Sequence, residues 1–277
     1  MKLVSIPANP VPDGVVTGAI ETPDGVNLRF ARWAPPPGRK GTVVVLQGRA
    51  EFIEKYFETV RDLHARGFAV ATFDWRGQGL SDRRLSDRHK GYVRNFSHYI
   101  TDLEAIMEQV VMPDCPPPYF ALAHSMGGAV VIRGCHDGIR WFERIVLSAP
   151  MIALPAGRLT RVAGPLARFM RMIGRGGAYV PTGDSAATGS ESFIGNVLTS
   201  DPVRYARNAA VLEQEPELGL GAPTVAWADA AMRQMKAFAD SSYAVRIRQP
   251  ILMVAAGRDE VVSTPAIEAF GQNLLAG

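Results

Sequence analysis

Cysteine is scarce in this sequence, whose 277 residues include only Cys115 and Cys135. Two cysteines are too few for a disulfide framework, and they are typical of a protein in a reducing compartment. Long apolar runs are missing too, since none approaches the roughly 20 residues of a membrane-spanning helix. The amino terminus carries one lysine and no apolar segment before its prolines, so we expect no secretory signal. These absences favour a cytoplasmic protein.

A strong excess of charge of either sign is also missing. The sequence has 30 Lys and Arg against 27 Asp and Glu, a net charge of +3. Because this excess is small and dispersed, we expect no nucleic-acid partner, although it is compatible with an anionic membrane surface. Hydrophobic residues make up 47% of the chain and charged residues 21%, which predicts a globular protein with a substantial core. The length suits one large domain, or a domain that carries an insertion.

Short apolar runs alternate with helical patterns along most of the chain. Residues 14–35 predict a hairpin with its turn at Pro23-Asp24-Gly25. Further runs predict buried strands over 42–48, 68–74, 119–124, 144–149 and 250–256. Apolar spacing predicts helices over 54–67, near 97–112 and over 125–138. The alternation indicates βαβ units, hence an α/β fold with a mainly parallel sheet and helices on both faces.

Residues 151–220 lack a comparable buried strand and are predicted to form a mostly helical cap. This cap separates the first part of the core, residues 1–150, from the second part, residues 221–277. In its segment 158–175, apolar side chains fall on one side of a helix (Leu159, Val162, Leu166, Phe169, Met170, Ile173) and arginines opposite (Arg161, Arg168, Arg171, Arg175). Pro165 predicts that the helix proper begins there. The apolar side is expected mainly to pack on its own domain, but it also suits an acyl-chain pocket or a lipid surface.

The stretch AHSMGGA, residues 123–129, lies between a predicted strand and a predicted helix. Small residues two positions before and two after a serine let it occupy a strained turn that exposes its hydroxyl. Ser125 is therefore a candidate nucleophile, which would need a base within hydrogen-bond reach. Its hydroxyl and the amide of Met126 lie at a helix N-terminus, where developing negative charge is favoured. Taken alone, the five residues 123–127 would also fit a serine that caps a helix after a strand.

Four segments occur in the order of one known family and together cover nearly the whole chain. They are LQGRAEFIEKY (46–56), DWRGQGLSDR (74–83), HSMGG (124–128) and AAGRDEVV (255–262). The sequence resembles the α/β-hydrolases of the monoacylglycerol lipase and lysophospholipase branch, which also contains S33-type serine aminopeptidase domains. In the same order, the segments are similar to that branch's H-G-x-x-E oxyanion segment, its D-x-R-G-x-G-x-S loop, its nucleophile motif and its acid segment. The resemblance implies the α/β-hydrolase fold and no metal or cofactor.

The resemblance also implies roles for single residues. Ser125 would be the nucleophile, the amides of Arg49 and Met126 would form the oxyanion hole, and Asp259 would orient the base. Glu51 matches the motif glutamate and is expected to shape the oxyanion loop rather than take part in chemistry.

Three further motif residues are expected to be structural or to depart from the family. Asp74 and Arg76 are expected to hold their loop. Gln47 stands where the family commonly has a histidine, and the resemblance to bacterial lysophospholipases, which often lack that histidine, makes this departure tolerable.

The base is the missing part of this apparatus. His124 is not expected to serve, because Ser125 projects out of its turn while the base must approach from across the site. In this fold the order is Ser, Asp, His, and after Asp259 the sequence holds residues for one helix only. The other histidines (His64, His89, His98, His136) are expected at the surface or in packing. We therefore expect a hydrolase cut short at its carboxyl end, without the final strand and its histidine, in preference to one that has lost its base.

The activity implied by the resemblance is hydrolysis of carboxylic esters through an acyl-enzyme, on lysophospholipid or monoacylglycerol substrates. An aminopeptidase or a small-ester esterase on the same fold is the alternative among enzymes. An inactive hydrolase fold that serves as a binding protein is the alternative outside enzymes. A lipid ester is the expected partner, and the cap is compatible with peripheral contact at the inner membrane.

Overall fold

The computed structural model describes residues 1–35, 38, 40–181, 183–190 and 192–275, except for the side chains of residues 158–161. Within these ranges, seven strands form one sheet in the order β1-β2-β4-β3-β5-β6-β7. The strands are β1 (Val15–Glu21), β2 (Asn27–Trp33), β3 (Thr42–Leu46), β4 (Ala69–Phe73), β5 (Tyr119–His124), β6 (Phe142–Ser148) and β7 (Ile251–Val254). The predicted hairpin and the five predicted parallel strands are confirmed. Strand β2 pairs antiparallel with β1 and with β4, and the neighbours in the order β4-β3-β5-β6-β7 pair parallel.

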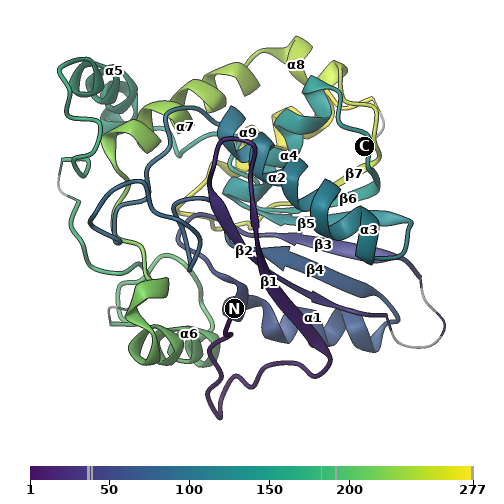
Figure 1. Cartoon of the computed structure of the whole chain (residues 1–277). Helices are drawn as coiled ribbons and strands as arrows, with labels where there is room; N and C mark the ends of the chain where they lie inside the picture. Colours follow the sequence, from purple (N-terminus) through teal and green to yellow (C-terminus); the bar gives the residue numbers. More distant parts are fainter. Residues whose placement is uncertain (36–37, 39, 182, 191, 276–277) are drawn as a thin grey trace.

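Helices cover both faces of the sheet, as predicted (Figure 1). One face holds the 3₁₀ turn η1 (Ile53–Tyr56) and α1 (Phe57–Ala65). The opposite face holds α2 (Ser97–Ile106), α4 (Met126–Asp137), α8 (Ser241–Val245) and α9 (Thr264–Gln272). A π-helical turn, η2 (Met107–Val111), and α3 (Met112–Asp114) extend α2 to the end of the predicted 97–112 helix.

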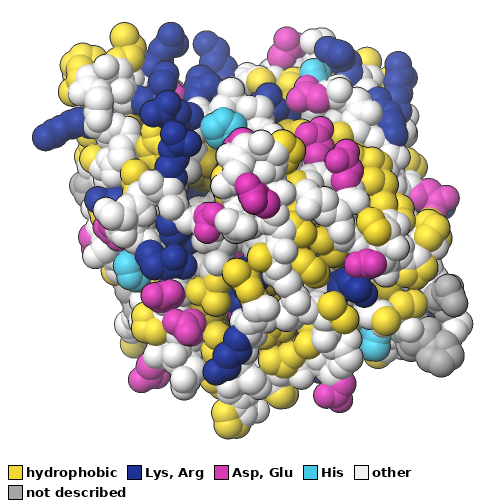
Figure 2. Space-filling model, in the orientation of Figure 1, with side chains coloured by type: hydrophobic (Ala, Val, Ile, Leu, Met, Phe, Trp, Pro, Cys, Tyr) yellow, Lys and Arg dark blue, Asp and Glu magenta, His cyan; other side chains and the backbone are white. Residues whose placement is uncertain are grey.

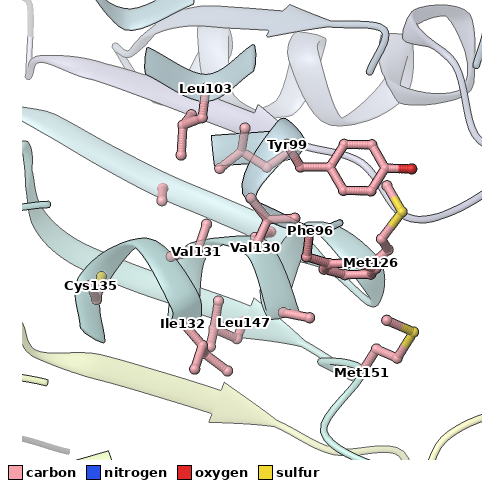
Figure 3. Close-up of a cluster of buried hydrophobic side chains, with 14 of the residues drawn as sticks. Phe96, Tyr99, Leu103, Met126, Val130, Val131, Ile132, Cys135, Leu147 and Met151 are labelled. Carbon is pink, nitrogen blue, oxygen red and sulfur yellow. The ribbon is translucent and has the colours of Figure 1, made fainter. Parts of the chain in front are cut away.

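Alternate residues of the central strand β3 enter two separate cores. Val44 and Leu46 join the larger core, whereas Val43 and Val45 join the smaller core with Phe57 of α1. This alternation is the consequence of the two-residue period of a strand that is buried on both faces. Figure 3 shows the larger core, where buried side chains of α2, α4 and β6 meet (Tyr99, Leu103, Met126, Val130, Leu147).

Among the described residues, the segment predicted to be the cap contains three helical elements. They are α5 (Arg158–Met172), α6 (Pro202–Gln214) and the 3₁₀ turn η3 (Pro216–Leu218), followed by α7 (Val225–Phe238). Trp227 of α7 packs against Phe96, which directly precedes α2, and Arg171 of α5 pairs with Asp229 of α7 at 2.7 Å. Helix α7 therefore connects the cap segment to the core. The division into residues 1–150, 151–220 and 221–277 stays a prediction.

Helix α5 differs from its prediction in two ways. It begins at Arg158 and runs through Pro165, although the proline was expected to begin it. A proline removes one backbone hydrogen bond, but packing of a helix on its neighbour can outweigh that loss. Arg171, which belongs to the side predicted to lie opposite the apolar residues, pairs with buried Asp229. The side chains of Leu159 and Arg161 lie outside the described residues.

Candidate active site

Ser125 lies in a strained turn between β5 and α4. Its φ of 47° and ψ of −111° fall in a region that non-glycine residues rarely adopt. The turn is fixed by its own backbone, because Ser125 N donates to Ser148 O at 3.1 Å and Ser125 O accepts from Met151 N at 3.0 Å. The strand-turn-helix context expected from the sequence is present, and it turns the Ser125 side chain into a cleft.

The start of α4 packs closely on the end of β3. A Cβ atom built on Gly127 would lie 2.4 Å from Leu46 O and 2.7 Å from Gln47 O. Only glycine fits there, so the serine turn and the loop that follows β3 are held against each other. This contact brings Arg49 near the turn, and no acceptor for the Arg49 or Met126 amide is found among the described residues. Both N–H groups could therefore serve a developing oxyanion.

Glu51 organises the loop after β3. Its Oε2 accepts from Gly48 N at 2.6 Å and from the Tyr56 hydroxyl at 2.5 Å, and His124 Nδ1 lies 3.1 Å from the same oxygen. The Lys55 ammonium pairs with its other oxygen. Burial alone would raise the pKa of Glu51, but Lys55 and His124 hold that pKa well below its ordinary value. A buried carboxylate with four partners is a structural anchor, as expected from the sequence.

Gln47 turns away from the cleft. Its side chain is fully buried, and its Nε2 donates to Thr72 Oγ1 of β4 at 3.2 Å. The backbone carbonyl oxygen of Gln47 accepts from Trp75 Nε1 at 3.0 Å. The residue at the position of the family's histidine therefore ties the oxyanion loop to the sheet.

Asp74 and Arg76 hold their loop, as expected. Asp74 accepts from the backbone of Ile53 and Leu80 and pairs with Arg29, while Arg76 pairs with Asp102 at 2.7 Å.

Asp259 follows β7 and lines the same cleft as Ser125, as predicted. Its Oδ1 accepts from Val261 N and Val262 N, both at 2.8 Å, so the carboxylate is fixed by the backbone of its own loop. The second oxygen accepts no protein donor within the described ranges and is available to orient a base.

The cleft is large and mainly apolar. Its volume is about 1450 Å³, which exceeds the usual size of a small-ligand pocket. Val162, Leu166 and Met170 of α5 line it, together with Met232 and Met235 of α7. Phe169, predicted to lie on the same apolar side of α5, is not in the lining and is 59% exposed. The apolar side of α5 is therefore wider than the part that lines the cleft, and only the edge with Val162, Leu166 and Met170 faces the cleft.

None of the five histidines, all of which are described, hydrogen-bonds to Ser125 or Asp259. His124 is the histidine of the cleft, and its Nδ1 is engaged with Glu51. His64 contacts Ala34 O, and His136 stacks on Tyr243. This arrangement agrees with the expectation that the base is not among these side chains.

Sequence reasoning missed the side chains of Lys55, Tyr56 and Arg49, of which Lys55 and Arg49 line the cleft. Lys55 and Tyr56 complete the Glu51 cluster, and the i,i+4 spacing of Glu51 and Lys55 was an available signal. The Arg49 side chain was also missed, because only its backbone amide was considered. Its contacts come from Gly221 and Trp227, which are far away in the sequence.

The strand order, the serine turn after β5, the loop after β3 and the carboxylate after β7 define the α/β-hydrolase fold. The sequence profile of the family described as serine aminopeptidase, S33, matches residues 37–276. The chain therefore belongs to this family.

Relatives and solved structures agree with that placement. Lysophospholipase L2 of Escherichia coli K12 is 35% identical over 209 residues, which cover 74% of this chain and 59% of that protein. The chain thus spans less than two thirds of this relative. Monoacylglycerol lipase of Mycolicibacterium smegmatis is 24% identical over 65% of this chain and 61% of its own length. A soluble variant of monoglyceride lipase from Saccharomyces cerevisiae, solved with a substrate analog, shares the fold with a TM-score of 0.70 at 17% identity, over 96% of this chain and 84% of that one.

Proposed function

We propose that this protein is a serine carboxylic-ester hydrolase for monoacyl lipids, of the lysophospholipase or monoacylglycerol lipase type. The observation that carries the proposal is a strained, cleft-facing Ser125 at the base of a largely apolar cavity of about 1450 Å³. Each methylene group of a ligand that is buried against apolar side chains contributes about 0.8 kcal/mol to binding, so the apolar lining of this cavity favours a long acyl chain. Two relatives are named for the hydrolysis of lipid esters, one as a lysophospholipase and one as a monoacylglycerol lipase, which supports the same substrate class.

In the proposed reaction, Ser125 Oγ attacks the ester carbonyl and the head-group alcohol leaves. The amides of Arg49 and Met126 hold the negative charge on the carbonyl oxygen during attack. A base oriented by Asp259 takes the Oγ proton and returns it to the leaving alcohol. Water then attacks the acyl-enzyme and releases the fatty acid. His124 is not assigned as the base, because its Nδ1 is held by Glu51.

The experiment compares substrates with the protein expressed from its complete gene. We expect release of fatty acid from lysophosphatidylethanolamine and from monoacylglycerol, and loss of at least a thousandfold in kcat/KM in Ser125→Ala. Ser97→Ala is the matched control, since Ser97 begins α2 and does not line the cleft. Cleavage of amino-terminal residues from peptides with no ester hydrolysis would instead establish an aminopeptidase. A folded protein with neither activity would refute the proposed hydrolysis and favour the alternative of a binding protein.

We also propose peripheral contact of the cap with the inner face of the cytoplasmic membrane. Phe169 and Met172 of α5 are 59% and 72% exposed, and Ile173, which directly follows the helix, is 56% exposed. Arg168 and Arg175 are exposed beside them. Figure 2 has apolar and basic side chains together at its upper left, where Figure 1 places α5. Apolar side chains flanked by arginines suit the interface of an anionic bilayer. Among the described residues, no helix is long and apolar enough to cross a membrane.

A further inference from the structure

The Arg49 side chain is held in the cleft by two neutral groups. Its Nη2 donates to Gly221 O at 2.6 Å, and its guanidinium lies 5.1 Å from the centre of the Trp227 ring. Trp227 is itself fixed, because it is 8% exposed and its Nε1 donates to the Tyr99 hydroxyl at 3.0 Å. The guanidinium therefore has a defined position on the wall of the cleft that contains Ser125.

This guanidinium has no carboxylate partner in the part of the chain that the structure describes. Its Nε is buried and makes no hydrogen bond. Burial lowers the pKa of Arg49 to about 10, and the ionisable groups that oppose this shift are Tyr99 and Tyr179. By contrast, buried Arg29 pairs with both Glu54 and Asp74. Arg49 is half-buried, and a cation partly withdrawn from water without an anion is unfavourable, so the Arg49 site is incomplete as it stands.

The missing partner must be an anion that enters the cleft. A guanidinium offers five N–H donors in a planar fork, which matches the oxygens of a phosphate. Lys55 cannot supply the same site, since its charge is used by Glu51. The Arg49 guanidinium is also suitably placed, relative to an ester bound at Ser125, to bind an anionic head group. The Arg49 amide belongs to the proposed oxyanion hole, and its side chain leads from there toward Gly221 and Trp227.

We propose that the Arg49 side chain binds the phosphate of a lysophospholipid head group. The inference rests on the proposed function, since it places the scissile ester at Ser125. In a lysophospholipid acylated at the first glycerol carbon, three carbons and one oxygen separate the ester oxygen from phosphorus. The Arg49 side chain has a similar number of bonds between its backbone and its guanidinium. A monoacylglycerol presents a neutral hydroxyl at the same point and leaves Arg49 without an anion.

Binding of uncleavable ligands tests this without catalysis. The two ligands carry the same alkyl chain in ether linkage, one as a lysophosphatidylethanolamine analogue and one as an alkylglycerol, both below their micelle concentrations. Isothermal titration calorimetry gives the ratio of their dissociation constants. We expect the wild type to prefer the phosphate-bearing ether, and Arg49→Gln to reduce this preference by about tenfold to a hundredfold. Arg49→Lys should retain part of it, because the charge remains without the fork.

Arg258→Gln is the matched control, because Arg258 lines the mouth of the same cleft and is exposed. We expect it to change the preference by less than twofold. A wild type without preference, an unchanged preference in a folded Arg49→Gln, or an equal loss in Arg258→Gln would overturn the proposal. The same anion could also come from free phosphate in solution, and titration with inorganic phosphate tests this alternative. Phosphate that binds wild type as tightly as the lipid does, and does not bind Arg49→Gln, would assign Arg49 to the free ion.

Binding and hydrolysis fail separately in this design. Selective binding without ester hydrolysis would retain the role of Arg49 and overturn the proposed function. Ester hydrolysis without selective binding would retain the proposed function and overturn the role of Arg49.

Discussion

At the scale of the residue, one glycine connects the two halves of the proposed catalytic apparatus. Gly127 lies two residues after Ser125 and faces the carbonyl oxygens of Leu46 and Gln47, which begin the loop that carries Arg49. These are backbone atoms that cannot rotate away from an added methyl group. The position of the nucleophile and the position of the oxyanion amides therefore depend on the same contact.

Gly127→Ala is expected to lower both stability and activity. The new methyl group must displace β3 or α4, and overpacking of this kind costs about 1–3 kcal/mol in the free energy of unfolding. Denaturant unfolding measures that loss, and kcat on a monoacyl ester should fall more than tenfold. Gly257→Ala is the control, since no atom of the described part of the chain lies within 4 Å of a Cβ atom built there. A fully stable Gly127→Ala protein would show that the close packing of α4 on β3 is wrong.

At the scale of the element, α5 presents two different apolar edges. Val162, Leu166 and Met170 follow one another at intervals of four residues and line the cleft. Phe169 and Met172 lie on the adjacent edge and are mostly exposed. One helix could thus hold an acyl chain on its inner edge and contact lipid on its outer edge.

Met170→Asp and Phe169→Asp should separate these two roles. A charge at Met170 enters the apolar cleft, so kcat/KM should fall more than tenfold for a long-chain ester and less than threefold for a short-chain one. A charge at Phe169 should instead reduce sedimentation with anionic vesicles several-fold, with a smaller effect on long-chain hydrolysis. Val16→Asp is the control for vesicle binding, because Val16 is an exposed apolar residue of β1. The same pattern for both α5 variants would refute the two-edged helix.

At the scale of the whole molecule, the cap segment is tied to the core by ion pairs. Glu58 of α1 accepts from Arg204 at 2.8 Å and from Arg207 at 2.6 Å, both on α6. Hydrogen bonds from Arg204 and Arg207 lower the pKa of Glu58 to about 2. On the other side of the cap, Arg171 of α5 pairs with Asp229 of α7.

Glu58→Gln should therefore destabilise the protein in a pH-dependent way. The pKa of Glu58 is lower in the folded state than its ordinary value of 4.5, so its contribution is complete above that value and is lost as pH falls toward 2. Because these pairs are partly exposed and screened by water, we expect about 1 kcal/mol in all, or a Tm lower by about 2–4 °C at pH 7. The difference in Tm should shrink between pH 4.5 and pH 2.

Glu213→Gln on α6 is the matched control, since Glu213 is exposed and forms no ion pair among the described residues. A Tm difference for Glu58→Gln that does not change with pH would exclude an ionic contribution of Glu58.

The sequence by itself determined the sheet, the serine turn and the segments that meet at its edge. These features depend on local patterns, because a buried strand such as β3 must be apolar on both faces and the Ser125 turn needs small neighbours. Parallel strands then bring the segments after β3, β5 and β7 to one edge without further information. The resemblance to the family's motifs then implied roles for Ser125, Asp259 and the Arg49 amide, which all lie in these segments.

Only the tertiary structure decided how side chains pair across the chain. A helical stripe does not reveal that Met170 faces the cleft while Phe169 faces out, because the orientation of α5 is set by its packing on α7. Nor could any local pattern show that the Arg49 guanidinium meets Gly221 and Trp227 and, among the residues that the structure describes, no carboxylate. Such contacts join residues more than 170 positions apart, and their energies depend on burial and distance, which exist only once the chain has folded.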